Sequence, residues 1–545
     1  MVPRQPRGHA PLPPHDHRDG GLLQHRRLQR RYPRVPLDPG AARRGAADRL
    51  RVPRRTGRRT PHRGLGSGGA GPGPVVRSGE EGVPPVTQAA RLSPEALASL
   101  PPAVARPLYD RDAQAVGIVH FGIGAFHRAH QAWYTDAAMN LGDRDWAITG
   151  VSLRSPGVAR QMNPQHGLYA LAERSGEGTR LRVVGSVRNV LVASEEPESV
   201  IAAVASPTTR VVSLTVTEKG YCRGETGDLD FELAHSLSFY YFVAQGLLAR
   251  RKAGLPGVTL LPCDNLADNG AKLERLMRQY LERHEPDLVA WFEANCTCPS
   301  TMIDRIVPAT TDEDRAMVAD ALNGLDDQAC VVTEPFSQWV IEDRFAGPRP
   351  GWEAVGAQLV HEVGPYETAK LRMLNGAHSL LAYCGLAAGH ACVHEAIADP
   401  ALRHLAIRLM REEAAPTITP APGQDLAAYA DALIDRFANP ALDHRLIQIA
   451  MDGSQKIPQR WLETLAANAR AGRQCPAILA GIKAWLHHLT GANGPVDDPL
   501  ATRLTTLATR HPNPADTAKA IFTQNGPLDG TWLPTQHDLN TLKET

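Results

Sequence analysis

Two glycines placed directly after a short apolar run constrain the fold of this chain more than any other feature. The run Gly117-Ile-Val-His-Phe121 ends at Gly122-Ile-Gly124, and a helical pattern follows it through Trp133 and Tyr134. Strand, tight turn and helix in this order are typical of dinucleotide binding: the first glycine permits the bend, and the second lets the backbone approach a pyrophosphate. The signal is weak by itself, because His127 stands where the motif has its third glycine. We expect the turn to bind a cofactor through Gly122, Ile123, Gly124, Ala125, Phe126, His127 and Arg128.

The segments after this turn continue the alternation of strand and helix. Residues 146–154 read as a second strand, and β-rich apolar runs follow at 181–184, 210–216 and 258–262, with a helical stretch at 237–251 between the last two. This pattern predicts an α/β fold, a Rossmann-like doubly wound parallel sheet covered by helices on both faces. From about Tyr366 onwards almost every segment reads as helix, interrupted by Pro400, Pro416, Pro440, Pro458 and Pro476.

We therefore expect three segments. Residues 1–85 form a leader, residues 86–360 a Rossmann-type NAD(P)-binding domain, and residues 361–545 a mostly α-helical domain that binds substrate and carries the catalytic residues. The preference between NAD and NADP stays open. An acid at the end of the second strand would hold the ribose 2′-hydroxyl of NAD, but Ser152, Arg154 and Ser155 stand there. Arg154 is either a contact to a 2′-phosphate or a solvated cation.

The leader differs from the rest of the chain in composition. Residues 1–85 hold 18 arginines, no lysine and 6 acidic residues, a net charge of +12, whereas the other 460 residues carry −11. The leader contains no Ile, Phe, Trp or Cys, so it lacks the apolar area that folding needs, and disorder is expected. A targeting peptide and a nucleic-acid-binding arm are the alternatives. A further hypothesis is a translation start near Val86, which would leave residues 1–85 out of the native protein.

Bulk composition excludes several classes of protein. No run of 18 apolar residues occurs, so no membrane span is expected. The eight cysteines are scattered, and only Cys296-Thr-Cys298 is close, without the spacing of a zinc site. We expect a cytoplasmic protein with structural thiols and no metal.

The segment Lys370-Leu-Arg-Met-Leu-Asn375-Gly-Ala-His378, preceded by Glu367, places acid–base groups in apolar surroundings. At about 100° per residue, Glu367, His378 and Asn375 fall about 60°, 80° and 140° from Lys370, on one broad helix face. Burial lowers the pKa of a lysine and makes it a usable base. About 12 Å of helix nevertheless separates Lys370 from His378, and each residue alone is open to a purely structural role.

Two loops follow predicted strands and are expected to line the cofactor cleft. Thr217 and Glu218 follow the strand at 210–216, although Glu218 and Lys219 could equally form a surface ion pair. Asn265 follows the strand at 258–262, and its carboxamide could stabilise a developing alkoxide. Helix capping by Asp264 or Asn265 is the alternative.

Together, six motifs in order resemble the mannitol dehydrogenase family of long-chain, zinc-independent polyol dehydrogenases. They are residues 122–131, 217–221, 263–265, 299–308 and 334–336 and the pattern Lys370-x4-Asn375-x2-His378. The likeness covers roughly residues 110–530. Residues 371–379 and 448–456 are most similar to the fructuronate reductase branch, also called D-mannonate oxidoreductases.

The resemblance implies roles for individual residues. Lys370 would be the general base, Asn265 and Asn375 would hold the alkoxide, His378 would orient the substrate oxygen, and Glu367 would lie on the proton's exit route. Asp304 would bind substrate. We infer in addition that Lys456, with Arg445 as a second candidate, faces a sugar-acid carboxylate, although both could be surface cations.

The sequence thus favours an NAD(P)-dependent oxidoreductase that interconverts D-mannonate and D-fructuronate. Oxidation of mannitol or arabinitol is the alternative within the class. A non-catalytic dinucleotide-binding sensor and a nucleic-acid-binding protein are remote alternatives. The expected partner is a small-molecule substrate, with no nucleic acid and no membrane, and oligomeric state stays undetermined.

Overall fold

The computed structural model describes residues 90–543, except Ser236 and residues 442–443. All described residues fall within one compact unit. The expectations for the leader therefore lie outside the described residues. No helix of the described part of the chain is both long and apolar enough to cross a membrane.

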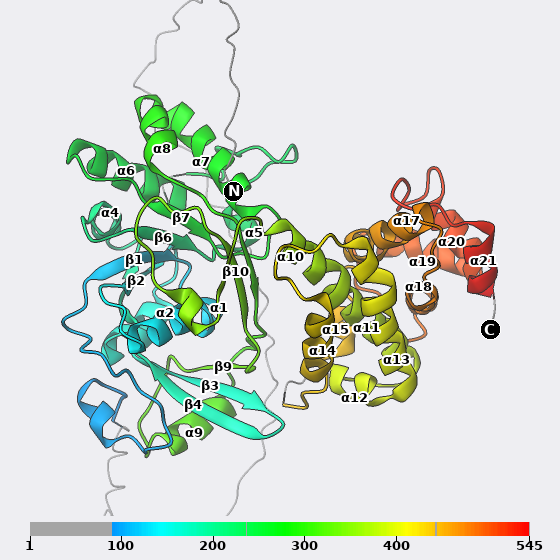
Figure 1. Ribbon diagram of the computed structural model, residues 1–545, viewed down its shortest axis with the longest axis horizontal. Helices are drawn as coiled ribbons and strands as arrows, with labels where there is room; N and C mark the ends of the chain where they lie inside the picture. Colours follow the sequence, from blue (N-terminus) through cyan, green and yellow to red (C-terminus); the bar gives the residue numbers. More distant parts are fainter. Residues whose placement is uncertain (1–89, 236, 442–443, 544–545) are drawn as a thin grey trace, which may run out of the picture. The chain divides into compact units, whose positions relative to one another are not determined.

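A five-stranded sheet forms the centre of the N-terminal part (Figure 1). Its strands lie in the order β5 (Val187–Val192), β2 (Ala147–Ser152), β1 (Val116–Phe121), β6 (Val211–Leu214) and β7 (Thr259–Pro262). Every neighbouring pair is parallel. Numbered along the chain this is the order 3-2-1-4-5 of a doubly wound Rossmann sheet, so the predicted fold class is confirmed. The order reverses between β1 and β6, which places the ligand crevice at the carboxyl ends of these two strands.

Both faces of this sheet are buried, as parallel sheets require. Ile118 of β1 packs with α2 (Gln131–Asn140) and α3 (Gly157–Met162) in one hydrophobic core. Its neighbour Val119 points the opposite way and packs in a second core. That core is built from α4 (Pro197–Ala205), α6 (Phe239–Lys252) and α7 (Asn269–His284).

One predicted strand belongs to a different sheet. The run at 181–184 is the end of β4 (Gly178–Val184), which forms an antiparallel hairpin with β3 (Tyr169–Ser175). The third strand of the parallel sheet is β5, which begins only two residues after β4 ends. Both runs are apolar, so composition could not tell which of them enters the parallel sheet.

Two small sheets complete the N-terminal part. The hairpin pairs with β9 (Val331–Thr333), and a second three-stranded sheet has the order β11 (Gln358–Val360), β10 (Gln338–Glu342) and β8 (Thr301–Asp304). Strand β8 matters for the site, because it carries Ile303 and Asp304 towards the helical part. The remaining helices before residue 360 are α1 (Ala125–Ala129), α5 (Thr217–Gly220), α8 (Val289–Asn295) and α9 (Asp312–Ala321).

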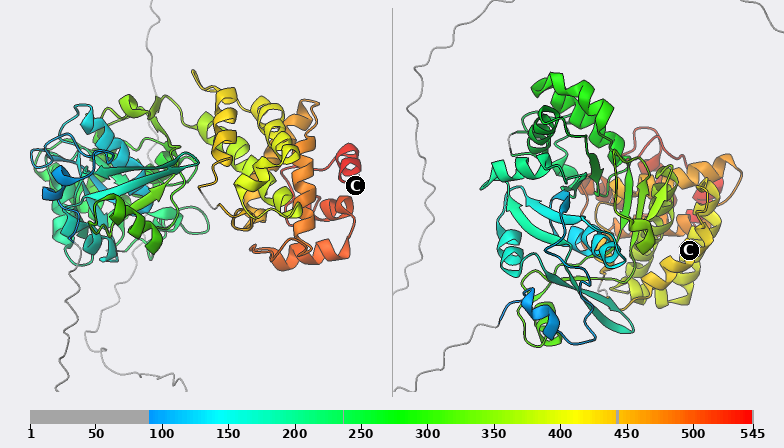
Figure 2. Two further views of the ribbon diagram at one scale, coloured as in Figure 1. Left: turned by 90° about the horizontal axis from the view of Figure 1, so that it is seen from below. Right: turned by 60° about the vertical axis from the view of Figure 1, so that its left-hand side comes forward.

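After β11 the described chain is helical, and Figure 2 distinguishes this segment by its yellow to red colours. One continuous helix contains α10 (Gly364–Ala369), a π-helical turn η5 (Lys370–Asn375) and α11 (Gly376–Ala387). The other main elements are α12 (Val393–Ala398), α13 (Pro400–Arg408), η6 (Leu409–Ala414), α14 (Leu426–Phe437), α15 (Leu446–Ile449), α16 (Gly453–Ile457), η8 (Pro458–Leu462), α17 (Glu463–Arg470), α18 (Pro476–His488), α19 (Ala501–Arg510), α20 (Pro514–Phe522) and α21 (Gln536–Lys543).

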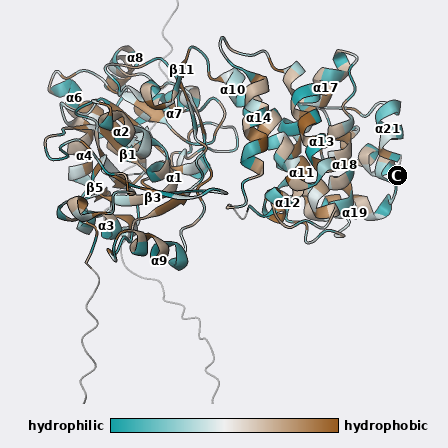
Figure 3. Ribbon diagram, turned by 60° about the horizontal axis from the view of Figure 1, so that its bottom comes forward, coloured by the Kyte–Doolittle hydropathy of each residue, from teal (hydrophilic) through white to brown (hydrophobic). Residues whose placement is uncertain are grey.

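This segment has its own core. Hydrophobic residues of α11, α13 and α18 pack together around Trp461 and Trp485, and Figure 3 colours them brown. Pro458, expected to interrupt a helix, instead opens the π-helical turn η8 inside the continuous run from α16 to α17.

Candidate active site

Glycine stands at positions 122 and 124, after β1, for two different structural reasons. Gly122 has φ +93°, and a Cβ there would lie 2.0 Å from the carbonyl oxygen of Thr215, so that the tight turn requires glycine. Gly124 is exposed, and a Cβ on it would meet nothing nearer than the Gly122 oxygen at 3.9 Å. Space therefore remains beside Gly124, at the switch point of the sheet. The turn therefore fits the close approach of a dinucleotide pyrophosphate.

Three other side chains of the predicted cofactor turn point into the protein. Ile123 packs against Gly150, and the buried His127 ring stacks on His120 with ring centroids 3.4 Å apart. Arg128 donates to the carbonyl oxygens of Ala329 and Gly124. Ala125 and Phe126 are half-buried. Only the backbone of these buried residues is left to contact a cofactor, and packing on His120 explains the histidine at the third glycine position.

The end of β2 offers a cation rather than an acid. Ser152 Oγ donates to the carbonyl oxygen of Ser155 at 2.6 Å, and the exposed Arg154 guanidinium has no hydrogen-bond or ion-pair partner among the described residues. Arg154 therefore stays available for either of its two predicted roles.

Asp264 ties together the two loops that follow β6 and β7. Its carboxylate accepts from the backbone N–H groups of Val216 at 3.2 Å and Thr217 at 2.8 Å, and from the Tyr221 hydroxyl at 3.0 Å. The alternative of helix capping is wrong for α7, whose N-cap is Asp268, but Asp264 does accept the backbone N–H groups at the start of α5. The pairing of Glu218 with Lys219 is also wrong. Glu218 instead forms an ion pair with Arg223 at 2.6 Å.

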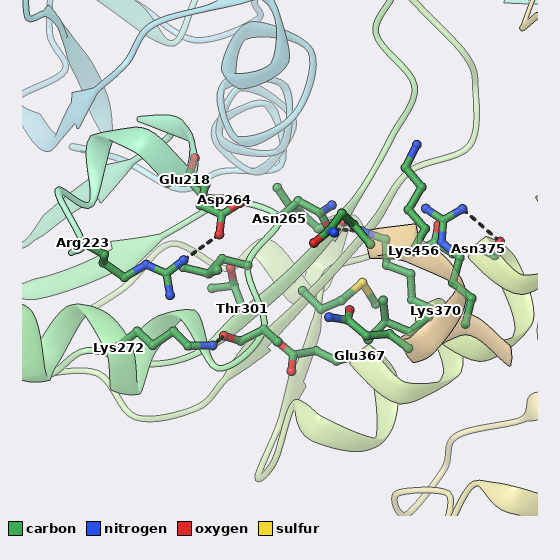
Figure 4. Close-up of a pocket in the computed structure, with 18 residues that line it drawn as sticks. Glu218, Arg223, Asp264, Asn265, Lys272, Thr301, Glu367, Lys370, Asn375 and Lys456 are labelled. Atoms are coloured by element: carbon green, nitrogen blue, oxygen red, sulfur yellow. Dashed lines mark hydrogen bonds and ion pairs between the residues drawn. The ribbon is translucent and has the colours of Figure 1, made fainter. Parts of the chain in front are cut away.

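A cavity of about 460 Å³ opens beside these loops (Figure 4). Its polar lining comes from both parts of the chain: Glu218, Arg223, Asp264, Asn265, Lys272, Thr301, Glu367, Lys370, Asn375, Gln455, Lys456, Gln459 and Arg460. The volume falls in the range of small-ligand sites.

Lys370 is the central cation of this pocket. It is only 8% exposed, and its Nζ donates to Asn265 Oδ1 at 2.8 Å and to the Ile303 carbonyl oxygen at 2.7 Å. Burial lowers the pKa of Lys370, and the nearby Asp304 carboxylate opposes this shift. Two of the three ammonium donors are engaged, which leaves one position for a substrate oxygen.

The π-helical turn brings Lys370 and Asn375 to the same pocket. In an α-helix these residues lie about 140° apart, but a π turn bonds residue i to residue i+5, so that residues five apart lie one above the other. The α-helical geometry assumed from the sequence is therefore wrong for this turn. Glu367, one turn earlier, lines the pocket and accepts the Asp268 backbone N–H at 3.2 Å.

His378 does not line this pocket. Its ring packs against Phe437 and His444, with centroids 4.7 and 5.3 Å apart, in a small adjacent cavity. Burial, and then the neighbouring His444, hold the pKa of His378 well below its usual value, so that the ring is neutral. The structure thus separates His378 from Lys370 and Asn375.

Asp304 is held by a residue that the sequence did not reveal. Arg436 of α14 donates to both Asp304 oxygens at 2.7 and 3.1 Å and to both Glu334 oxygens at 2.6 and 2.9 Å. All three side chains are buried. Asp304 therefore acts on Lys370 through its charge and through β8, and its carboxylate is already engaged. No local pattern could identify Arg436, because its partners lie more than 100 residues away.

The predicted carboxylate-binding cations are placed differently. Lys456 lines the pocket, whereas Arg445 is exposed, forms a backbone bridge with Cys392 and lies outside the lining. Sequence reasoning missed Arg460, which lines the pocket and follows Lys456 by four residues, a spacing that could have revealed it. It also missed Lys272 and Arg223. In the described part of the chain, no group of three or more His, Cys, Asp or Glu side chains is arranged to hold a metal ion.

Comparison with protein-family models matches the mannitol dehydrogenase Rossmann domain over residues 116–354 and the mannitol dehydrogenase C-terminal domain over residues 362–523. The chain belongs to the mannitol dehydrogenase family. It is therefore an oxidoreductase with the family's Rossmann domain and C-terminal domain.

Relatives with different substrates are similarly close. D-mannonate oxidoreductase of Escherichia coli (strain K12) is 41% identical over 78% of this chain and 91% of that protein. Mannitol 2-dehydrogenase of Phaeosphaeria nodorum is 37% identical over 76% of this chain and 77% of that protein. The solved ternary complex of Pseudomonas fluorescens mannitol 2-dehydrogenase with NAD and D-mannitol matches with 35% identity and a TM-score of 0.68, over 83% of this chain and 95% of that one.

Proposed function

We propose that this enzyme interconverts D-mannonate and D-fructuronate with NAD(H), and that Lys370 is its general acid–base. The observation that carries the proposal is the position of Lys370. It is buried, held by Asn265 and the Ile303 carbonyl, and faces a cavity whose helical side carries two more cations, Lys456 and Arg460. A neutral lysine can take a proton from a secondary hydroxyl, and the ammonium form can return it in the opposite direction.

The two asparagines complete the acid–base site. Because Asn265 Oδ1 already accepts from Lys370, its amide N–H groups remain to stabilise a developing alkoxide, and Asn375 lines the same cavity. Glu367, beside the loop before α7, marks the side on which the proton leaves Lys370. When bound at the glycine turn, the dinucleotide would supply the oxidant. A site of this kind polarises the substrate with hydrogen-bond donors and needs no metal ion.

A sugar acid fits the charge of the pocket better than a neutral polyol. The three acidic residues of the lining are engaged: Glu218 by Arg223, Asp264 by three donors, and Glu367 by the Asp268 N–H. Lys456 has only Asp452 at 3.9 Å as an ion-pair partner, and Arg460 has none among the described residues. The identity with D-mannonate oxidoreductase supports the same choice, whereas the mannitol enzymes among the relatives keep mannitol or arabinitol oxidation as the second candidate.

Steady-state kinetics over D-mannonate, D-mannitol and D-arabinitol, each with NAD and with NADP, tests the proposal. We expect the highest kcat/KM for D-mannonate, and unchanged rates after exhaustive dialysis against EDTA. Activity on the polyols alone would refute the proposed substrate, and a rate that EDTA abolishes and Zn²⁺ restores would refute metal independence. The comparison of NADP with NAD in these assays tests whether Arg154 faces a 2′-phosphate.

A further inference from the structure

The helical wall of the pocket presents cations without matching acids. Lys456 and Arg460 lie four residues apart on the continuous run formed by α16 and η8, and both line the cavity. The nearest carboxylate to Lys456 is Asp452 at 3.9 Å, and Arg460 has no ion-pair partner among the described residues. We propose that Arg460 binds the carboxylate of a sugar-acid substrate and thereby discriminates sugar acids from neutral polyols. This inference rests on the proposed function.

The hydrogen bonds of Arg460 leave free the edge of the guanidinium that can bind a carboxylate. Its Nη1 donates to Ser379 Oγ at 2.8 Å and to the Asn375 carbonyl oxygen at 3.3 Å, which fixes the guanidinium against the π-helical turn. Its Nε and Nη2 have no hydrogen-bond partner in the described structure. These two N–H groups form the side of the guanidinium that binds a carboxylate in a bidentate manner.

Lys456 is less suited to this role. Its Nζ donates to the carbonyl oxygens of Met451 at 2.5 Å and Ile449 at 3.4 Å, so that one donor at most is left for a ligand. A lysine also acts as a point charge and does not match the plane of a carboxylate. We therefore assign Lys456 to general attraction of the anion and Arg460 to its recognition.

Arg460 is half-buried in the wall of the pocket, which strengthens the discrimination. Loss of solvent lowers the pKa of Arg460 to about 10, so that it remains charged at neutral pH. A neutral polyol would displace solvent from this cation and leave it unpaired, whereas a carboxylate would compensate it. Lys370 and Arg460 line the same cavity, so that one substrate can contact both.

The test compares Arg460→Met and Arg460→Lys with the control Arg470→Met. Arg470 lies ten residues later in the same helical run, is exposed, and donates only to the Ala466 carbonyl oxygen. We expect Arg460→Met to lower kcat/KM for D-mannonate at least about 30-fold more than for D-mannitol, mainly through KM. Arg460→Lys keeps the charge but loses the planar pair of N–H groups, so we expect an intermediate loss of kcat/KM for D-mannonate. Arg470→Met should stay within about twofold on both substrates.

A second measurement is independent of turnover. D-mannonate should raise the Tm of the wild-type enzyme and of Arg470→Met, and should raise it much less in Arg460→Met and Arg460→Lys. Equal losses on both substrates, or equal thermal protection in all variants, would overturn the role of Arg460 while leaving the proposed function intact. A wild-type enzyme that oxidises only polyols would overturn both. If Arg460→Met does not fold, Arg460→Lys carries the comparison.

Discussion

Lys370 loses nearly all of its solvent on folding and gains hydrogen bonds to neutral acceptors rather than an ion pair. Its charge environment comes from four elements: Asp304 on β8, Glu367 on α10, Arg436 on α14 and Arg460 on η8. Burial outweighs the two carboxylates, and the pKa therefore lies below its ordinary 10.5. This is the direction that a general base needs near neutral pH.

A pH dependence follows from the sign of this shift. Oxidation requires neutral Lys370, so kcat/KM for oxidation should rise with pH and level off above a pKa lower than 10.5. Reduction requires the ammonium form, so kcat/KM for reduction should fall over the same pH range.

Lys370→Ala should lower kcat about 10²–10⁴-fold, while NADH still raises the Tm. The exposed Lys519→Ala is the control. Near-normal turnover in Lys370→Ala would contradict the role.

The two glycines of the turn predict opposite phenotypes. Gly122→Ala places a Cβ 2.0 Å from a backbone oxygen at φ +93°, so the free energy of unfolding should fall by at least about 2 kcal/mol. Gly124→Ala meets no such contact, so stability should change by less than about 1 kcal/mol, but dinucleotide binding should weaken. Thermal unfolding with and without NAD measures both. Normal NAD affinity in Gly124→Ala would disprove the cofactor's close approach.

At the scale of elements, buried ion pairs join α14 to β8 and to the loop after β9. Arg436 forms ion pairs with both Asp304 and Glu334, and its guanidinium also lies over the Phe336 ring at 4.4 Å. Burial of two carboxylates without this cation is strongly unfavourable. The interaction also positions Ile303, whose carbonyl oxygen holds Lys370.

Arg436→Leu should therefore lower the free energy of unfolding by about 3–5 kcal/mol. An exposed ion pair of the same helix provides the control, because Arg411 of η6 contacts Asp431 of α14. Arg411→Leu should cost less than about 1 kcal/mol. Urea denaturation monitored by tryptophan fluorescence measures both variants. Similar losses in the two would mean that the buried network contributes no more than a surface pair.

The π-helical turn shows where sequence reasoning at this scale stops. An α-helical wheel places Lys370, Asn375 and His378 on one broad face, whereas in the structure Lys370 and Asn375 line the pocket and His378 lies in a separate small cavity. Hydrophobic periodicity reports which face of a helix is buried but not whether one turn bonds over four or five residues. The pairing of 181–184 in a hairpin was hidden for a similar reason, because strand partners are chosen by tertiary contacts.

At the scale of the whole molecule, every residue assigned to the site lies between Gly122 and Arg460, and the family models cover residues 116–354 and 362–523. A chain that lacks residues 1–85 should therefore keep kcat and KM within about twofold of the full chain. Purified full-length and shortened enzymes assayed side by side provide the measurement. A loss of more than about tenfold would show that the leader contributes to activity.

The sequence by itself determined the Rossmann class, the glycine turn and the helical second part, and it singled out Lys370, Asn265 and Asn375, which line one pocket. These features depend on local patterns, on backbone conformations that only glycine adopts and on the order of motifs, all of which one chain displays. Only the tertiary structure decided that His378 lies outside the pocket, that Arg436 holds Asp304, and that Arg460 rather than Arg445 lines the pocket. These outcomes depend on burial and on partners distant along the chain, because the strength of a charge interaction is set by the solvent that folding removes.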